Sequence, residues 1–495
     1  MSDPWSAFGD DDRERAGAAR GAAARRARRA SAHAFFARDG GRAGVDGDVD
    51  AVRAAVLDDF DRRRAGEGVR TFAPGGAGAA DACARARDAA RRDDWTSARR
   101  EARRVIWACA KQLEAGNWPD DGFLDAHTLA HGVVVLAELK GGEDDAGDEE
   151  FFTDDPTVSA ACRDAGWDRR TRLGRIALDL LAASTLYSPD RVPEWCADAV
   201  ALVERAFSRG ESADATGEKP PLESVIPSAL PERGVPTLEP GRAIAVEQAS
   251  ELSTTRFYTD YIAKERPCVI KGHIGADGED WKLMDDFKTL DLFETYAETI
   301  VPVEYGTAFE SHGTGVTTLG AFARDFLVPS NDAHDGLPPS EKVAYISQHP
   351  IFNQIPAMQG SFTISPYCLG RIRTETSAIN AWLGTAGTKT AIHRDPYLNL
   401  LCQIAGHKYI RIYDDAQTKY LYCDDTDVLR AGNRNTFTRS PVNPESAADA
   451  REYPLASHAE YLETILAPGD VLFMPKNHWH YVRSLTTSVS VNFWF

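Results

Sequence analysis

The feature that most constrains the fold is a series of short apolar runs in the second half of the chain, each ended by Gly, Pro or Asp. They cover residues 267–271, 300–304, 343–346, 379–383, 398–404, 409–413, 471–474, 479–485 and 488–495. Many short strands at this spacing are typical of a β-sandwich or a β-barrel. The second half is therefore predicted to form such a β domain.

The first half has the spacing of amphipathic helices instead. From Trp95 to Leu113, apolar side chains recur every three or four residues, which places them on one helical face, and Asp94 can cap the first turn. Similar stretches follow at 125–139, 170–183 and 193–207. An all-α region followed by a β domain gives an α+β chain.

Two changes in composition divide the chain further. Residues 1–90 are rich in Ala, Arg, Asp and Gly with few large apolar groups, so this low-complexity segment is predicted to bury little and to be part helix and part disordered. Residues 208–241 are rich in proline, through which neither helix nor sheet can run. We expect a helical domain over 91–207, a Pro-rich linker over 208–241 and the β domain over 242–495.

Composition also limits the function classes. The net charge of −19 disfavours nonspecific binding to nucleic acid, and no apolar run approaches the about 20 residues that cross a bilayer. The cysteines are scattered without a C-x-x-C pair, which fits a reducing compartment. We expect neither nucleic acid nor membrane as a direct partner, and a nuclear or cytoplasmic location. The basic cluster at 25–29 favours the nucleus.

One motif carries recognisable chemistry. His393 and Asp395 are two residues apart in the sequence Ala-Ile-His-Arg-Asp-Pro of residues 391–396, so in a strand both would point to one side. His480 follows a Pro-Gly-Asp turn and an apolar strand that would return the chain to the domain interior. Two imidazoles and one carboxylate form the facial triad of non-haem Fe(II) oxygenases. The simpler alternative is a surface histidine beside a turn Asp-Pro.

A lysine supplies a second, independent signal. In the run 408–413, alternation puts Lys408 on the same side as Ile410 and Ile412, where an unpaired ammonium group is costly. A cation aimed into a barrel suits an anionic ligand, such as the distal carboxylate of 2-oxoglutarate. The alternative is that Lys408 extends along the strand to the rim and reaches water. His478 would share a strand face with His480 and is the strongest rival among the other histidines.

Several motifs, in order along the chain, resemble the JmjC oxygenases. They lie at residues 345–356, 380–384, 390–396, 406–413, 468–470 and 479–485. The resemblance covers 242–495 and is closest to the subgroup described both as a lysine demethylase and as an arginyl hydroxylase. It implies a double-stranded β-helix, which is a cupin-like jelly-roll barrel, with flanking helices.

The resemblance also implies roles for single residues. His393, Asp395 and His480 become the Fe(II) ligands, and the contacts to the cosubstrate 2-oxoglutarate become Tyr345, Trp382, Thr390, Asn399 and Lys408. Dioxygen is the remaining reactant. Thr390 fits a regular strand poorly, because three residues separate it from His393 and it would face the other way. We therefore expect a twist, bulge or turn near Gly387 to redirect it.

Substrate contacts are implied at two further positions. Glu304 and Gln348 match positions that bind a guanidinium group in the arginyl-hydroxylase members, and a carboxylate suits that group physically. An aromatic residue expected ten positions after Glu304 is absent, since Thr314 stands there. This departure concerns the substrate and leaves the oxygen chemistry untouched.

Three functions remain open at this point. The favoured one is an Fe(II)- and 2-oxoglutarate-dependent hydroxylase that acts on an arginine side chain of a protein or peptide. A JmjC-type histone methyl-lysine demethylase is the second. The third is a noncatalytic interaction protein with the same fold.

Overall fold

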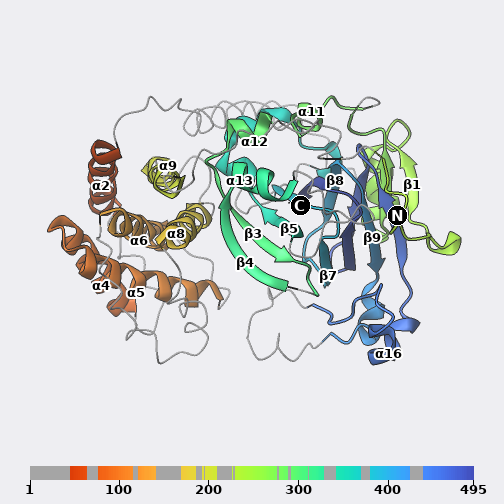
Figure 1. Cartoon of the computed structure of the whole chain (residues 1–495). Helices are drawn as coiled ribbons and strands as arrows, with labels where there is room; N and C mark the ends of the chain where they lie inside the picture. Colours follow the sequence, from red (N-terminus) through yellow and green to blue (C-terminus); the bar gives the residue numbers. More distant parts are fainter. Residues whose placement is uncertain are drawn as a thin grey trace, which may run out of the picture.

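The computed structural model describes residues 45–63, 76–114, 121–140, 169–184, 192–193, 195–208, 226, 229–275, 278–287, 291–309, 311–327, 342–369, 379–423 and 439–495. The basic cluster at 25–29 lies outside these residues. None of the described helices combines the length and the apolar character that a membrane span requires. Figure 1 shows the helical region on one side of the molecule and the β-sheets on the other.

Six long helices form the first region. They are α2 (Val45–Arg62), α4 (Gly76–Arg91), α5 (Trp95–Glu114), α6 (Asp121–Lys140), α8 (Arg169–Ser184) and α9 (Trp195–Ser208). The predicted cap of α5 is confirmed, because the Asp94 carboxylate accepts a hydrogen bond from the Ser97 amide at 3.1 Å. α6 is central, and its described side chains from Leu124 to Glu138 are all buried.

The helical region begins earlier than the predicted boundary at residue 91. Helices α2 and α4 lie within the segment expected to bury little, and they share a core with α5, α6 and α9. Val56 and Phe60 of α2 are buried there, as are Ala82 and Ala86 of α4. Small alanine side chains let helices approach closely, so α4 packs without the large apolar groups that the prediction looked for.

The second region contains two sheets. The larger has the strand order β1-β2-β11-β8-β13-β6-β5-β3-β4, and the smaller has β10-β9-β12-β7. The strands are β1 (Ala245–Gln248), β2 (Cys268–Lys271), β3 (Ile300–Gly306), β4 (Ser311–Thr318), β5 (Ala344–His349), β6 (Ile379–Gly384), β7 (Lys389–Arg394), β8 (Asn399–Ala405), β9 (Lys408–Tyr413), β10 (Leu462–Leu466), β11 (Val471–Met474), β12 (Trp479–Ser484) and β13 (Ser488–Trp494). The short helices α10 (Thr254–Phe257), α11 (Lys282–Asp286), α12 (Asp291–Thr295), α13 (Leu319–Phe322), α14 (Ile351–Gln354) and α16 (Asp449–Glu452) connect them.

From β6 to β13 the chain crosses between the two sheets at almost every step, and only β9 and β10 are consecutive in one sheet. This alternation is the topology of a jelly roll, so the predicted α+β fold with a double-stranded β-helix is confirmed. All nine predicted runs overlap strands, while β1, β4 and β10 were not predicted as strands, and β7 was considered only through the spacing of His393 and Asp395.

The two regions pack against each other at the edge of the larger sheet. Ile300 at the start of β3 belongs to the same apolar cluster as the helices, and Val316 of β4 packs on it. Gly174 of α8 lies so close to β4 that an added Cβ would stand 2.5 Å from Cγ1 of Val316. Figure 1 shows the β3–β4 hairpin between α8 and the rest of the sheets.

The last residues of the predicted linker are bound to the smaller sheet of the β region. The Gly234 carbonyl accepts a hydrogen bond from Arg483 at 2.8 Å, and the Glu239 amide donates to Glu463 at 2.7 Å. Val235 and Leu238 pack on the outer face of the smaller sheet. Residues 234–239 therefore form part of the β region, and do not act as a free linker.

Candidate metal centre and cosubstrate pocket

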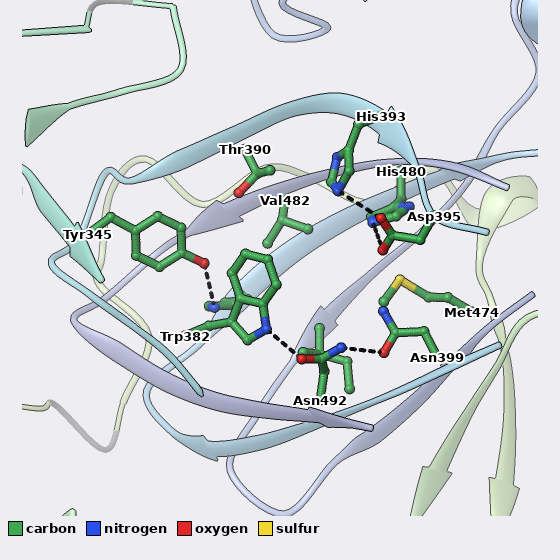
Figure 2. A pocket seen from close by; sticks show the side chains of 12 residues that line it. Tyr345, Trp382, Thr390, His393, Asp395, Asn399, Met474, His480, Val482 and Asn492 are labelled. Carbon is green, nitrogen blue, oxygen red and sulfur yellow. Dashed lines mark hydrogen bonds and ion pairs between the residues drawn. The ribbon is translucent and has the colours of Figure 1, made fainter. Parts of the chain in front are cut away.

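A pocket lies between the two sheets. Its walls are Tyr345, Trp382, Thr390, His393, Asp395, Asn399, Leu401, Lys408, Met474, His480, Val482 and Asn492 (Figure 2). The larger sheet contributes β5, β6, β8, β11 and β13, and the smaller contributes β7, β9 and β12. The pocket thus occupies the interior of the jelly roll.

His393, Asp395 and His480 converge at one end of this pocket. Nε2 of His393 lies 3.9 Å from Oδ1 of Asp395, and Nε2 of His480 lies 3.7 Å from Oδ2. One ligand atom from each residue lies within 4.8 Å of the others, and no other such group occurs among the residues that the structure describes.

Neighbouring strands bring the two histidines together. β7 and β12 are antiparallel, and His393 stands directly opposite His480 in their register. Asp395 is the first residue after β7, and its carbonyl accepts a hydrogen bond from the Asn477 amide at 2.7 Å. The prediction that Asp395 continues the strand was therefore wrong by one residue, because the chain turns at Asp395-Pro396.

Backbone contacts fix which ring nitrogens are free. Nδ1 of His393 lies 2.9 Å from the carbonyl of Ala391, and Nδ1 of His480 lies 3.1 Å from the carbonyl of His478. A carbonyl can only accept, so each Nδ1 carries a proton, and Nε2 is the ring nitrogen that faces Asp395. This orientation is the one by which a histidine binds a metal through Nε2.

The electrostatics of the cluster favour a cation. Burial raises the pKa of Asp395, and burial together with the neighbouring His480 holds the pKa of His393 well below its usual range. The cluster thus combines a buried carboxyl group with an imidazole, that of His393, which disfavours its charged form. Two nitrogen donors and one carboxylate fit a divalent transition-metal ion, iron among them.

His478, the rival histidine, lies outside this cluster. Its Nδ1 faces the carbonyl of Lys476 at 3.4 Å, and its side chain does not line the pocket. The motif at 479–485 therefore selected the residue that the structure brings to Asp395. His349, another buried histidine, is hydrogen-bonded to Gln354 at 2.8 Å and does not line the pocket.

A bulge in β7 places Thr390 in the pocket. In β7, Thr390 is three residues before His393, whereas the residues paired with them in β12, Val482 and His480, are only two residues apart. Ala391 and Ile392 thus stand opposite the single residue Tyr481, which reverses the side-chain parity. The expected irregularity exists, and it lies within the strand, beyond the turn at Gly387.

Lys408 is the buried cation of the pocket. Its side chain is 1% exposed, and Nζ donates to the Tyr345 hydroxyl at 3.3 Å. The described residues include no carboxylate in an ion pair with it, and burial lowers the pKa of Lys408 to about 7. The alternative in which Lys408 reaches water at the rim is wrong. A buried ammonium group that contacts the Tyr345 hydroxyl, with the Thr390 hydroxyl in the same pocket, fits the carboxylate of an anionic cosubstrate.

Glycine makes room for the tyrosine beside this lysine. Gly384 of β6 stands opposite Tyr345 in the register, and an added Cβ would lie 2.5 Å from Cδ2 of the tyrosine ring. The ring can therefore lie flat on the strand, with its hydroxyl toward Lys408 (Figure 2).

Asn492 of β13 is a pocket residue that the sequence analysis missed. Trp382 Nε1 donates to its Oδ1 at 2.9 Å, and its Nδ2 donates to Oδ1 of Asn399 at 3.2 Å. The available signal was the alternation Ser488, Ser490, Asn492, which places three polar side chains on one face of an otherwise apolar strand.

The two predicted substrate contacts lie outside the pocket walls. Glu304 of β3 is opposite Tyr345 in the register, so its exposed carboxylate lies one strand beyond the wall and accepts a hydrogen bond from Ser347. Gln348 is exposed at a bulge of β5, with φ of 45°. Thr314 is opposite Glu304 on β4 and is exposed.

Comparison with known proteins agrees with this geometry. The model of the cupin-like domain family matches residues 254–495. Lysine-specific demethylase 8 of Xenopus tropicalis is 32% identical over 318 residues, which are 64% of this chain and 66% of the relative. The protein of the same name from Danio rerio is 35% identical over 49% of this chain and 56% of its own length.

A more distant relative carries a different name. The human bifunctional peptidase and (3S)-lysyl hydroxylase JMJD7 is 23% identical over 48% of this chain and 80% of its own length. The residues that align with this chain cover less than two thirds of the length of either relative named lysine-specific demethylase 8. Residues 254–495 therefore form a cupin-like domain, and over this region the chain is similar to lysine-specific demethylase 8 and to JMJD7.

Proposed function

We propose that this protein is an Fe(II)- and 2-oxoglutarate-dependent oxygenase that oxidises a side chain of a protein substrate. One observation carries the proposal: His393, Asp395 and His480 share a buried pocket with Lys408, a cation without an acidic partner among the described residues. A metal site alone would suit many functions. A metal site and an anion site in one pocket suit an anionic, metal-binding cosubstrate.

The residues present fit both groups. His393, Asp395 and His480 would hold iron, and Lys408 with Tyr345 and Thr390 would hold the distal carboxylate of 2-oxoglutarate. When bound, iron with 2-oxoglutarate and dioxygen supplies the oxidation of an unactivated C–H bond, and the cosubstrate becomes succinate and carbon dioxide.

The rest of the pocket positions the cosubstrate and excludes water. Leu401, Met474 and Val482 form an apolar wall, which strengthens the attraction between Lys408 and a carboxylate. Asn399 adds an amide on the same side as Asp395 (Figure 2). The Nδ1 contacts of His393 and His480 keep both imidazoles in the orientation that metal binding needs.

For the substrate we favour an arginine side chain. The exposed Glu304 carboxylate beside Ser347 offers a guanidinium group an acceptor one strand from the pocket, and the exposed Gln348 is adjacent to Ser347. The second candidate is a methyl-lysine demethylase, which is favoured by the names of the two relatives called lysine-specific demethylase 8.

Mass spectrometry of peptides separates the candidates. Arginine-containing and methyl-lysine peptides are incubated with the protein, Fe(II), 2-oxoglutarate and oxygen, with His393→Ala as the inactive control. The proposal expects one added oxygen on arginine, and Glu304→Gln should reduce this product more than it reduces cosubstrate turnover. Loss of a methyl group would instead assign the demethylase.

A third outcome would contradict the proposed activity without bearing on the fold. If the iron-loaded protein converts no 2-oxoglutarate with either peptide, the noncatalytic interaction protein is the remaining function.

A further inference from the structure

Asn492 links the two sides of the pocket through its amide. It lies on β13, between β6, which carries Trp382, and β8, which carries Asn399. It is completely buried and hydrogen-bonds to both residues. Figure 2 shows the three side chains in one chain of hydrogen bonds, Trp382–Asn492–Asn399.

The indole of Trp382 determines which group donates and which accepts in each of these hydrogen bonds. An indole N–H can only donate, so the atom of Asn492 that faces Trp382 is its oxygen. The amide nitrogen of Asn492 must then face Asn399, whose oxygen accepts. As a result, the Asn399 amide turns its nitrogen away from Asn492 and toward Met474 and Asp395 (Figure 2).

We infer that Asn492 is a positioning residue that makes Asn399 present an N–H donor, and not a carbonyl oxygen, to an anionic cosubstrate at the metal end of the pocket. This inference rests on the proposed function and deepens it. Lys408 supplies the positive charge deeper in the pocket, while Asn399 contributes a neutral donor whose orientation depends on a residue that need not touch the ligand.

Asn492→Asp tests the direction directly. An ionised aspartate still accepts from Trp382 but cannot donate to Asn399, whereas a protonated one can, so binding is measured at a pH at which the introduced carboxyl group is ionised. The Asn399 amide is then expected to rotate and turn its oxygen toward the ligand. The measurement is calorimetric titration of the Mn(II)-loaded protein with 2-oxoglutarate. We expect binding weaker by about 10- to 100-fold, because a donor to a charged group is replaced by an acceptor. Mn(II) affinity should stay within about threefold.

Asn380→Asp is the matched control for the added carboxyl group. Asn380 is 1% exposed and stands opposite Asn492 in the register. Its amide nitrogen has no hydrogen-bond partner among the described residues. The same substitution there adds a carboxyl group at a similar depth without touching the chain of hydrogen bonds, and 2-oxoglutarate affinity should change by less than about threefold.

Repeating the substitution in an Asn399→Ala variant distinguishes an effect that acts through Asn399 from a general loss of structure in the pocket. In Asn399→Ala, the substitution Asn492→Asp should cost no more affinity than Asn380→Asp does, because the residue through which it acts is gone. If Asn492→Asp does not fold, Trp382→Phe removes the indole donor and should weaken 2-oxoglutarate binding in the same direction, by about 2- to 10-fold.

Three results decide the matter. Equal losses from Asn492→Asp in both backgrounds, or an Asn492→Asp variant that binds like the native protein, would overturn the inference and leave the proposed function standing. Weaker binding that depends on Asn399 supports it. Native Mn(II)-loaded protein that binds no 2-oxoglutarate would reject the proposed function and the inference together.

Discussion

At the scale of single residues, the metal site depends on which histidine faces Asp395. His480 does so through Nε2, while His478, two residues earlier, turns away toward the carbonyl of Lys476. His480→Ala should therefore weaken Mn(II) binding by roughly 100-fold or more, as removal of one of three ligands does. Mn(II) titration followed by electron paramagnetic resonance measures this affinity.

His478→Ala is the matched control for that substitution, because it removes an imidazole from the same strand region without touching Asp395. Its Mn(II) affinity should stay within about threefold of the native value. Equal losses in both variants would show that the ring at 480 is not a ligand.

The buried Lys408 gives cosubstrate binding a pH dependence. Burial lowers its pKa to about 7, so above that pH the free protein holds a neutral amine. Binding of an anion favours the ammonium form and then requires proton uptake. Affinity for 2-oxoglutarate should therefore fall as the pH rises above about 7, by up to tenfold per unit.

Calorimetry of the Mn(II)-loaded protein from about pH 6 to about pH 9 measures this slope. Lys408→Arg remains charged throughout and should bind with a much flatter profile. An Arg variant with the same slope as the native protein would assign the titration to another group.

Most residues of the site could be predicted from the sequence, for two different reasons. Strand alternation placed Lys408 inside, and the motif resemblance selected His480 over His478. The position of Thr390 required a bulge opposite Tyr481, which depends on pairing with a strand about 90 residues away and leaves no local trace. Asn492 was missed because its role comes from Trp382 and Asn399, which only the sheet brings next to it.

At the scale of elements, close packing of α8 on the β3–β4 hairpin joins the two regions. An added Cβ at Gly174 would lie 2.5 Å from Cγ1 of Val316 and 2.8 Å from the Phe207 ring. Alanine in a helix normally gains about 1 kcal/mol over glycine, but overpacking costs about 1–3 kcal/mol. Gly174→Ala should thus lower the melting temperature.

Gly360→Ala is the control, since nothing lies within 4 Å of its added Cβ. This variant should melt within about a degree of the native protein. Calorimetric unfolding of both variants decides the sign, and a Gly174→Ala variant that is stabilised would mean that α8 and β4 are not in close contact.

Elements were predicted where the pattern was local. Short apolar runs predicted the central strands β8, β9, β12 and β13, which are buried on both faces or nearly so. Strand β4 carries Gly313 and Gly315, which have low strand propensity, and it is a strand because β3 pairs with it along its length. The core residues of helix α4 were not predicted for the related reason that alanine is apolar but small.

At the scale of the whole molecule, a network of hydrogen bonds connects the helical region to the β region. Glu204 of α9 accepts hydrogen bonds from the Ile300 amide of β3 at 3.3 Å and from Gln354 at 3.2 Å. Gln354 also contacts His349 of β5, the strand that carries Tyr345. The helical region is thereby connected to the wall of the pocket.

Burial raises the pKa of Glu204 to about 7, so its ionised form is disfavoured in the folded protein. Stability associated with this group is present at low pH and declines as the pH rises from about 4.5 to 7. Glu204→Gln keeps an acceptor and cannot ionise. The variant should gain stability relative to the native protein as the pH rises through this window.

Chemical denaturation of both proteins at about pH 5 and about pH 8 measures this difference. A difference that is the same at both values would show that Glu204 does not change its charge on folding.

The central claim is that the pocket is an iron and 2-oxoglutarate site, and one measurement tests it most directly. The native protein and Lys408→Met are incubated with Fe(II), 2-oxoglutarate and oxygen, and succinate is quantified with His480→Ala as the inactive control. The account predicts succinate from the native protein, none above background from His480→Ala, and a raised 2-oxoglutarate requirement in Lys408→Met. Iron-loaded native protein that forms no succinate, or equal succinate from all three proteins, would contradict it.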